Sequence, residues 1–524
     1  MSDSTAKRIV LLSAAALAAG LGTANVLLGP LNLDEGWYLL SAKSFAAGRL
    51  PYRDFFFTQS PLLPAVYGVL SPLWSGSGLL GGRILTALLG LCASLLAAAA
   101  AAVSAGKERR FAAATTVFLL LQCNVAHSYF TTIPKTYALA SLFVSGAILA
   151  LAAALRTDGW RRAPCAAATG VLLALAAGTR LSLGAMLPVA GLCLLVAHRR
   201  HRFLWLWFGI GGTIGLAAAF APFVCGSWDS FAFANFFHGG RSGGGASLLL
   251  GSVARLARNY LPIALLAFFA AGRLIAKPGG HSFRPCDNHC SLFVFHFSLL
   301  CFAAAFLVHV TAPFPYDDYQ TPIMPFAAVA MSLAFWETAG DIRQNVVLPL
   351  FMALAFLFAA TSPFCESWLV LRKDRFWVEK KSTPDLAALR ETAREIDATL
   401  PPGVPLLTQD AYLAVECGRP VPPGFEMGPF GYFAELSGEE ATRHHVLNRD
   451  LALQAIRSGK YPVIALSGYA FTMSAPELKK NDAGRADMDG EIAKLYRLER
   501  IVPDFGQEHT PLHIWRITSQ QGGN

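Results

Sequence analysis

The chain has 524 residues, of which 54% are hydrophobic and only 15% are charged. Soluble proteins carry roughly 25% charged residues, so this deficit indicates a membrane protein rather than a large water-soluble one. The net charge of +9 lies in short basic runs between apolar stretches, as in cytoplasmic loops. This distribution argues against a nucleic-acid-binding protein.

The N-terminus begins with Lys7 and Arg8, followed by an apolar run from Ile9 to Leu28. About 20 apolar residues suffice to cross a hydrocarbon layer of about 30 Å. A signal peptide usually has a shorter apolar core that ends in a small-residue cleavage site. We therefore expect an uncleaved first membrane span.

Further apolar stretches predict a mainly α, polytopic membrane protein with about 11 transmembrane helices, plus a C-terminal soluble α/β domain. One helix over 164–198 would be about 52 Å long, too long for one crossing, so we expect a turn at Gly178-Thr179-Arg180. The stretches are 9–28, 79–103, 111–127, 136–155, 164–178, 182–197, 203–223, 260–275, 291–310, 321–336 and 346–361.

The basic residues predict the orientation of these spans. With the N-terminus inside, the inner segments carry 15 Lys or Arg, whereas the longer outer segments up to residue 345, together with Arg83 at the start of the second stretch, carry nine. The positive-inside rule favours this arrangement. We therefore expect a cytoplasmic N-terminus in the inner (plasma) membrane and, after 11 crossings, an extracytoplasmic C-terminus.

After Pro363 the sequence shows ordinary amphipathic patterning. It predicts helices over 385–400 and 445–458 and strands over 404–408 and 461–466, which together indicate a small α/β domain. We expect a transmembrane module over 1–365 and an extracytoplasmic domain over 370–524. No Gly-rich nucleotide-binding loop occurs in this region.

The cysteines give little sign of a metal site. Cys286 and Cys290, flanked by His281 and His289, superficially resemble zinc ligands. Zinc sites need a second ligand pair at defined spacing, and the sequence has none. We predict no metal ligands and no cofactor, although a divalent metal stays open.

The first outer loop, residues 30–78, carries the residues suited to chemistry. It contains LDEGWYLLSAK from Leu33, GRLPYRD from Gly48 and FFFTQSPLLP from Phe55. Two amphipathic pieces, 36–47 and 61–73, are too short or too polar to span and are expected to lie in the interface. Asp34, Glu35, Arg53 and Asp54 would then lie at the outer membrane–water boundary.

This loop resembles the first-loop signature of the GT-C superfamily of membrane glycosyltransferases. The branch concerned contains protein O-mannosyltransferases and bacterial lipid A and lipopolysaccharide-core glycosyltransferases. The resemblance is specific over residues 30–90, architectural over 91–365, and limited to position and size in the C-terminal domain. It implies transfer of a sugar from a polyprenyl-phosphate donor to a lipid, polysaccharide or protein hydroxyl outside the membrane.

The resemblance also implies roles for single residues. Asp34 matches the family's catalytic base and Glu35 its frequent acidic neighbour. Arg53, beside Asp54, lies where the family places a basic or polar residue near the donor phosphate, and Arg83 matches a recurrent arginine. Many members carry a second acid in the next outer loop.

That next outer loop, 128–137, has no acid in this chain. Either Asp34 works without a partner, or Glu35, Asp54 or the pair Asp317/Asp318 replaces it. The same departure from the family pattern keeps metal dependence open.

The chemistry requires these residue types independently of the resemblance. An acceptor hydroxyl must lose its proton to attack the anomeric carbon, and one carboxylate can accept it. Fixed cations stabilise the phosphate that leaves. One base without a covalent nucleophile predicts a single displacement with inversion. The candidate cations on outer segments are Arg53, Lys135, Arg180, Arg241, Arg255 and Arg258.

Each assignment has a simpler structural alternative. Asp34 could cap a helix that begins at Glu35, and Arg53 could form an ion pair with Asp54. Lys135, Arg180 and Arg83 at span edges point into a cavity or reach outward to the interface.

Two further outer segments are also ambiguous. The loop 225–258, with His238 and Arg241 near its glycines, is either a lid over the donor or a flexible linker. Asp317 and Asp318 fit a metal or sugar site, but an interfacial turn with solvated acids is the favoured interpretation. The resemblance to the family also implies that Tyr319 hydrogen-bonds the donor phosphate.

Two other functions compete with glycosyl transfer. A transporter or flippase would place acidic residues at mid-span, whereas the acids of this membrane region cluster in loops. A binding or scaffold protein would act through residues 370–524 alone. The sequence does not encode which sugar or acceptor is used.

Overall fold

The computed structural model describes residues 3–196, 203–237, 246–276, 289–312, 316–338, 343–361, 383–475, 479–480 and 482–518. The chain divides into two compact units. The helical unit comprises Met1–Val26, Thr86–Ala219 and Gly243–Arg375, and the mixed unit comprises Leu27–Leu85, Phe220–Ser242 and Phe376–Asn524. The mixed unit thus contains both the loop after the first helix and the C-terminal region.

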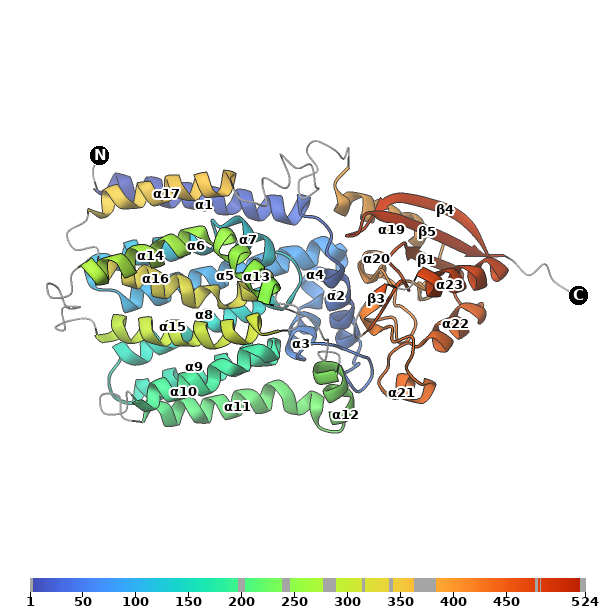
Figure 1. Cartoon of the computed structure of the whole chain (residues 1–524), viewed down its shortest axis with the longest axis horizontal. Coiled ribbons are helices and arrows are strands. Elements are labelled where there is room, and N and C mark those ends of the chain that lie inside the picture. Colours follow the sequence, from blue (N-terminus) through green and yellow to red (C-terminus); the bar gives the residue numbers. More distant parts are fainter. Residues whose placement is uncertain are drawn as a thin grey trace, which may run out of the picture. The chain divides into compact units, whose positions relative to one another are not determined.

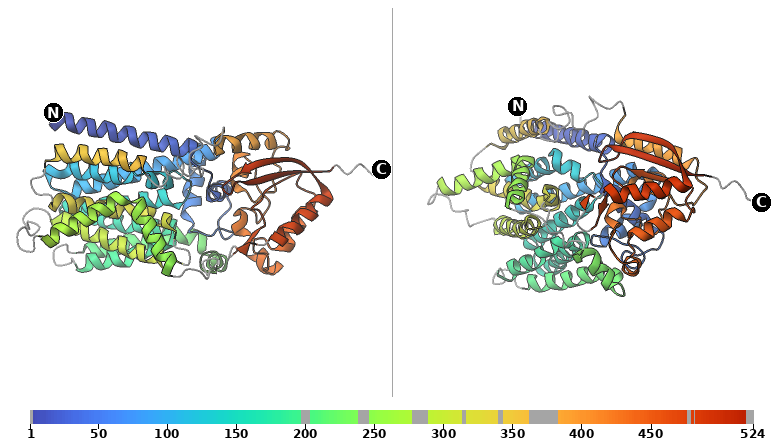
Figure 2. Two further views of the ribbon diagram at one scale, coloured as in Figure 1. Left: turned by 45° about the horizontal axis from the view of Figure 1, so that its top comes forward. Right: turned by 45° about the vertical axis from the view of Figure 1, so that its right-hand side comes forward.

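The helical unit is built from long apolar helices that run alongside one another (Figures 1 and 2). Helices α1, α5 and α11 each extend a short way into the mixed unit. The helices are α1 (Asp3–Leu28), α5 (Gly78–Ser104), α6 (Arg110–Leu121), α7 (Val125–Phe130), α8 (Thr136–Arg156), α9 (Arg162–Thr179), α10 (Met186–Val196), α11 (Leu204–Val224), α13 (Ala246–Asn259), α14 (Leu261–Ala276), α15 (His289–Val310), α16 (Met324–Thr338) and α17 (Gln344–Ala360).

Among the described residues, six helices are long and apolar enough to cross a membrane, or seven if the bent pair α13 and α14 forms one span. This confirms the prediction of a mainly helical, multi-pass protein. All eleven apolar stretches contain helix, but several are short; α6 has 12 residues and α16 has 15. The number of eleven crossings stays a prediction.

The predicted turn at Gly178-Thr179-Arg180 is confirmed. Helix α9 ends at Thr179, and Arg180 is extended, with φ −148° and ψ 113°. A 3₁₀ segment, Leu181–Ala185, then leads into α10.

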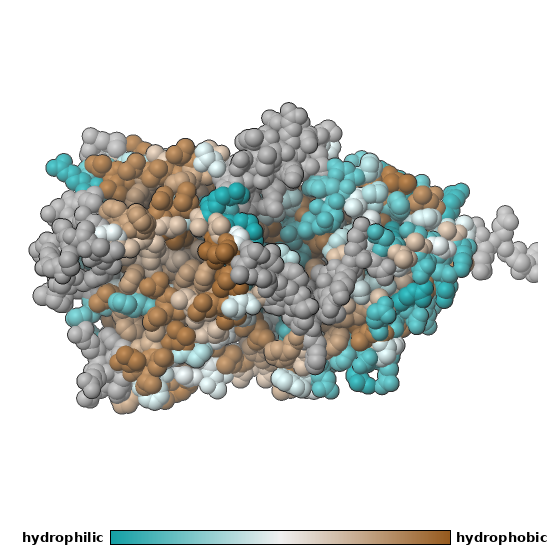
Figure 3. Space-filling view, viewed as in Figure 1, coloured by the Kyte–Doolittle hydropathy of each residue, from teal (hydrophilic) through white to brown (hydrophobic). Residues whose placement is uncertain are grey.

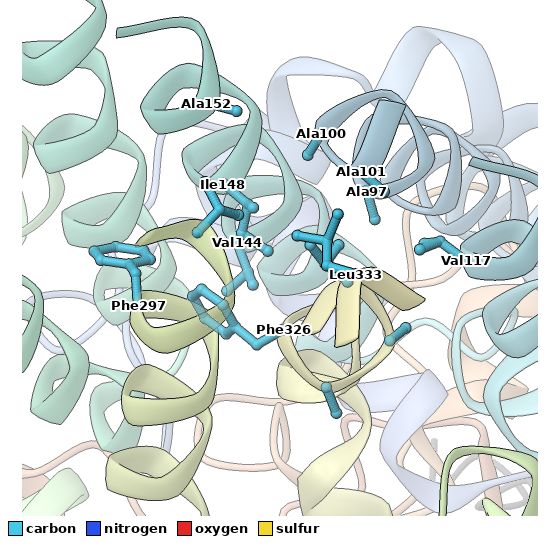
Figure 4. Packing of buried hydrophobic residues seen from close by; sticks show 14 of the residues in the cluster. Ala97, Ala100, Ala101, Val117, Val144, Ile148, Ala152, Phe297, Phe326 and Leu333 are labelled. Atoms are coloured by element: carbon cyan, nitrogen blue, oxygen red, sulfur yellow. The ribbon is translucent and has the colours of Figure 1, made fainter. Parts of the chain in front are cut away.

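Small side chains let the helices of this unit pack closely (Figure 4). Ala97, Ala101 and Val117 lie with Val144 and Leu333 in one buried cluster. Helices α9 and α11 come even closer, because a Cβ on Gly170 would lie 2.1 Å from the Phe208 carbonyl oxygen. Such close backbone approach is how helices associate in lipid, where burial alone offers little.

The mixed unit combines short helices with a small antiparallel sheet of order β1-β5-β4 and a two-stranded ribbon of β2 and β3. Its helices are α2 (Leu33–Ala46), α3 (Leu62–Val69), α4 (Ser71–Trp74), α12 (Trp228–Ala232), α19 (Asp385–Asp397), α20 (Ala411–Glu416), α21 (Gly438–Arg443), α22 (Arg449–Arg457) and α23 (Asp482–Leu495). Its strands are β1 (Val463–Ser467), β2 (Met473–Ser474), β3 (Lys479–Lys480), β4 (Tyr496–Phe505) and β5 (Thr510–Ile517).

The C-terminal predictions are confirmed in part. The helix over 385–400 corresponds to α19, and the strand over 461–466 to β1. The strand over 404–408 is wrong, since only Leu407 pairs, in a single bridge with Ile464. The helix predicted from 445 starts at Arg449, because Asn448 is extended and its side chain caps the helix.

Surface composition differs between the two units. Apolar side chains gather over the helices of the helical unit, and hydrophilic ones cover much of the C-terminal region (Figure 3). This contrast is the one expected where lipid surrounds one part of a protein and water the other.

Candidate functional site

Helix α2 begins directly before the predicted catalytic pair, and Asn32 is its N-cap. The Asn32 side chain accepts a hydrogen bond from the Asp34 N–H at 3.1 Å, and Glu35 Oε1 accepts one from the Asn32 N–H at 3.0 Å. Together these contacts form a capping box. The alternative in which Asp34 caps the helix is therefore wrong, and Asp34 lies in its first turn.

Glu35 and Arg83 form a buried ion pair within the mixed unit. Arg83 donates from Nε to Glu35 Oε2 at 2.6 Å and from Nη2 to Oε1 at 2.7 Å. It also donates to the carbonyl oxygens of Gly29 at 2.9 Å and Pro30 at 2.8 Å. The side chains are 0% and 1% exposed. Both are enclosed by protein and tie the start of α5 to the start of α2.

Asp34 is held differently. Its side chain is half-buried, and Oδ1 accepts a hydrogen bond from the indole Nε1 of Trp37 at 3.1 Å. Trp37 is itself buried, and its ring meets those of Phe57 at 5.8 Å and Phe430 at 6.2 Å. These ring contacts hold the Trp37 indole in place, and the indole in turn orients the Asp34 carboxylate.

Arg53 and Asp54 pair with each other in the turn that follows α2. Arg53 Nη2 lies 2.8 Å from Asp54 Oδ2, and the Arg53 side chain is 58% exposed. The same Asp54 oxygen accepts the Leu50 N–H at 2.7 Å. The hydrogen bond from Arg53 is the main cause that lowers the pKa of Asp54. The ion-pair alternative for Arg53 is therefore what the structure contains.

Residues of the C-terminal region hold α2 in place. A Cβ on Gly36 would lie 2.0 Å from the Tyr412 backbone nitrogen, so only glycine lets α2 cross α20 at this distance. Lys43 Nζ donates to the Val415 carbonyl oxygen at 3.0 Å. Burial lowers the pKa of Lys43.

Two more contacts join the first loop to the C-terminal region. Arg49 pairs with Glu426 at 2.7 Å. Glu416 Oε2 accepts the Leu79 N–H at 2.8 Å, at the N-terminus of α5. A carboxylate at this helix N-terminus accepts a hydrogen bond from an otherwise unpaired backbone N–H, and its negative charge interacts favourably with the helix dipole. Sequence patterns gave no sign of these pairs, since their members lie more than 300 residues apart.

Lys135 and Arg180, two of the predicted cations, come together in the helical unit. Lys135 Nζ lies 3.5 Å from Asp318 Oδ2, and the Tyr137 hydroxyl donates to that same oxygen at 2.8 Å. The Arg180 guanidinium lies 4.2 Å from the centre of the Tyr319 ring, a cation–π contact. We call these five residues the cation cluster.

The cation cluster carries two positive side chains and one negative one. Its neighbour His309 contacts Ser182 Oγ at 2.8 Å and Gln320 Oε1 at 3.2 Å, which fixes the ring beside Tyr319. Lys135, one of the two cations, is 6% exposed, and the His309 ring is 1% exposed. A costly buried cation such as Lys135 usually marks a functional site in a membrane protein.

Several predictions change in this region. Asp318 is not a solvated acid, because Lys135 and Tyr137 surround its carboxylate. The loop 225–258 contains α12, a π-helical turn (Phe233–Phe237) and α13 rather than only a flexible linker. His238 and Arg241 lie outside the described residues, as does the side chain of Asp317.

Among the described residues, no group of three His, Cys, Asp or Glu side chains is arranged to hold a metal ion. His281 and Cys286 lie outside the described residues. Arg255 and Arg258 are exposed on α13.

Comparison with solved structures identifies the fold. No protein-family model and no curated protein matches the chain. Among solved structures, apo ArnT from Cupriavidus metallidurans matches with a TM-score of 0.63 and 15% identity, covering 100% of both chains. ArnT bound to undecaprenyl phosphate matches with a TM-score of 0.61 and 15% identity, covering 98% of this chain and 99% of ArnT. The oligosaccharyltransferase of Archaeoglobus fulgidus matches with a TM-score of 0.45 and 12% identity, covering 97% of this chain and 74% of the oligosaccharyltransferase.

The chain has the GT-C fold. The match to ArnT extends over the C-terminal region, where the sequence resemblance was limited to position and size. It confirms the fold that the first-loop resemblance implied.

Proposed function

We propose that this protein transfers a glycosyl residue from a polyprenyl-phosphate-linked sugar to an acceptor hydroxyl on the outer face of the membrane. The observation that carries the proposal is Asp34, a half-buried carboxylate oriented by Trp37 in the first turn of a capped helix. ArnT, whose fold the chain has, is known bound to undecaprenyl phosphate.

Asp34 is the general base in this proposal. Its carboxylate accepts the proton of the acceptor hydroxyl as the hydroxyl oxygen attacks the anomeric carbon of the sugar. The bond from that carbon to the phosphate oxygen breaks, and polyprenyl phosphate leaves with the bonding electrons. A single displacement of this kind inverts the anomeric centre.

The cation cluster would hold the donor phosphate. Lys135 and Arg180 offer ammonium and guanidinium donors, and Tyr319 holds Arg180 through its ring. Asp318 pairs with Lys135 and therefore keeps the Lys135 side chain in place before the donor arrives. Fixed cations stabilise the growing charge of the leaving phosphate without having to reorganise.

Glu35 and Arg83 have a positioning role in this proposal and do not contact the substrates. Their burial and mutual hydrogen bonds support this role. Arg53 and Asp54 lock the turn after α2, although exposed Arg53 remains accessible to a phosphate.

The topology belongs to the same proposal. About 11 crossings with a cytoplasmic N-terminus would place the first loop and residues 370–524 outside the membrane. Lipid-linked donors are needed there because nucleotide sugars are not available outside the cytoplasm. The transmembrane module would then cover 1–365.

The proposal is tested by mass spectrometry of envelope glycolipids and glycoproteins from cells that lack the gene. Cells complemented with the wild type or with Asp158→Asn, a change at a side chain that is 95% exposed, should regain one sugar-bearing product. Arg180→Gln should restore much less of it, and undecaprenyl phosphate should bind that variant more weakly. An identical glycan profile with and without the gene would rule the function out.

A further inference from the structure

Helix α13 carries three distinct strips of side chains. It runs from Ala246 to Asn259, and successive residues of a helix are turned by about 100°. Ser252 is buried, and Leu256 packs against the core of the helical unit, so this strip faces protein. The strip beside it holds Leu250 and Val253, which are 70% and 38% exposed.

The third strip is basic. Arg255 and Arg258 are both exposed and project between the apolar strip and the protein-facing strip. Arg255 Nη2 also donates to Ser252 Oγ at 2.9 Å, which sets the direction of its side chain. The sequence of α13 itself contains no acidic residue.

Helix α13 also makes a sharp bend with its neighbour. The axes of α13 and α14 are bent by 91° at Tyr260. Helix α14 is apolar and buries Ile263 and Leu266 in the core of the bundle. If α14 runs along the membrane normal, α13 therefore lies close to the membrane plane.

Contacts at its end hold α13 in this direction. The Asn259 carbonyl oxygen accepts a hydrogen bond from Asn124 Nδ2 at 2.9 Å. The helix also packs against the 3₁₀ segment Asp317–Ile323, which carries Tyr319 of the cation cluster. Helix α13 thus lies at the membrane end where the cation cluster is found.

We propose that α13 is an in-plane helix that binds the anionic phospholipid headgroups of the surrounding membrane. Leu250 and Val253 enter the acyl region, and Arg255 and Arg258 pair with lipid phosphates at the headgroup level. An apolar strip beside basic side chains is the pattern that lets a helix lie in the interface. This inference does not depend on the proposed glycosyl transfer.

The experiment places an environment-sensitive dye on α13. An azide-bearing amino acid replaces Leu250 in the full-length protein, which is labelled and reconstituted in vesicles of phosphatidylcholine and phosphatidylglycerol. The same label at Glu439, whose side chain is 84% exposed in α21, is the control. Brominated acyl chains should quench the label at 250 and leave the label at 439 unchanged.

The charges are tested in the same vesicles. Brominated phosphatidylglycerol should quench the label at 250 at lower mole fraction than brominated phosphatidylcholine, by about fivefold per arginine. The double variant Arg255→Gln/Arg258→Gln should lose this preference and keep the quenching itself. Quenching by aqueous iodide instead of bromolipids would overturn the proposal.

Two further results would also overturn it. One is equal quenching by the two brominated lipids in the wild type, which would leave the arginines without a lipid role. The other is an arginine-dependent change that appears only when undecaprenyl phosphate is added. That outcome would assign Arg255 and Arg258 to the donor rather than to the bulk lipid.

Discussion

The buried pair of Glu35 and Arg83 gives a prediction whose size follows from the structure. Arg83→Met keeps the volume of the side chain roughly but removes two hydrogen bonds to Glu35 and two to carbonyl oxygens. It leaves a carboxylate that is 0% exposed without its counter-charge. Breaking one partner of a buried ion pair costs about 3–5 kcal/mol. We expect a loss of that size in the free energy of unfolding.

A double-mutant cycle separates the pair from its surroundings. In Glu35→Gln/Arg83→Met no charge is left buried, so part of the lost stability should return. Recovery stays incomplete because the carbonyl oxygens of Gly29 and Pro30 have still lost their donor, which costs about 1–3 kcal/mol for each buried group left unpaired.

The measurement is the unfolding of the purified protein in nanodiscs, induced by heat or by denaturant. Arg53→Met is the matched control, because it breaks an ion pair at a side chain that is 58% exposed and should change stability little. If Arg83→Met unfolds at the same midpoint as Arg53→Met, the interpretation of a buried structural pair is refuted.

Two further predictions concern the first loop. Gly36→Ala brings a Cβ to 2.0 Å from the Tyr412 backbone, so we expect a loss of about 2–3 kcal/mol by thermal unfolding. Gly490→Ala, at a helical glycine with nothing within 4 Å, should instead stabilise by about 0.5–1 kcal/mol; equal effects would contradict the close contact. The lowered pKa of Asp54 means that its contribution is complete above the ordinary aspartate pKa of about 3.9 and is lost as pH falls through the lower folded value. Amide exchange at Leu50, corrected for intrinsic rates, should therefore accelerate in acid, and unchanged protection would show that this lock does not hold the turn.

The first loop shows how far sequence reasoning reached. The signature predicted the fold and singled out Asp34, and the pieces 36–47 and 61–73, expected at the interface, correspond to helices α2, α3 and α4. The partner of Glu35 was not predictable, because Arg83 lies 48 residues away and comes near only when α5 packs beside α2. Asp34 and Glu35 are adjacent acids that look equivalent in the sequence, although Glu35 is buried and Asp34 is only half-buried.

The cation cluster was predicted only as separate residues. Lys135, Arg180 and Tyr319 each stood out as polar groups at the edges of apolar stretches. Their meeting depends on the packing of α8 and α9 and of the 3₁₀ segment that carries Asp318, and no spacing in the sequence encodes that packing. Asp318 was assigned to solvent because turn acids usually are solvated.

The C-terminal strands show another limit. Strand β4 exposes most of its residues in succession, so it lacks the apolar–polar alternation that marks a half-buried strand. Strand β1 is buried at every position and was predicted as a short apolar run. A strand that is buried on both faces appears in the sequence as a continuous apolar run. A strand that is exposed on both faces has no such pattern.

In the proposed reaction Asp34 removes the acceptor's proton, and a comparison of donor binding with sugar transfer in Asp34→Asn tests this role. The acceptor is first identified from the glycan profile, and transfer from a polyprenyl-phosphate sugar is then followed with purified protein. We predict that Asp34→Asn binds undecaprenyl phosphate like the wild type and loses transfer by at least about 100-fold, the lower range of a positioned general base. Transfer at a near-normal rate in this variant would contradict the account.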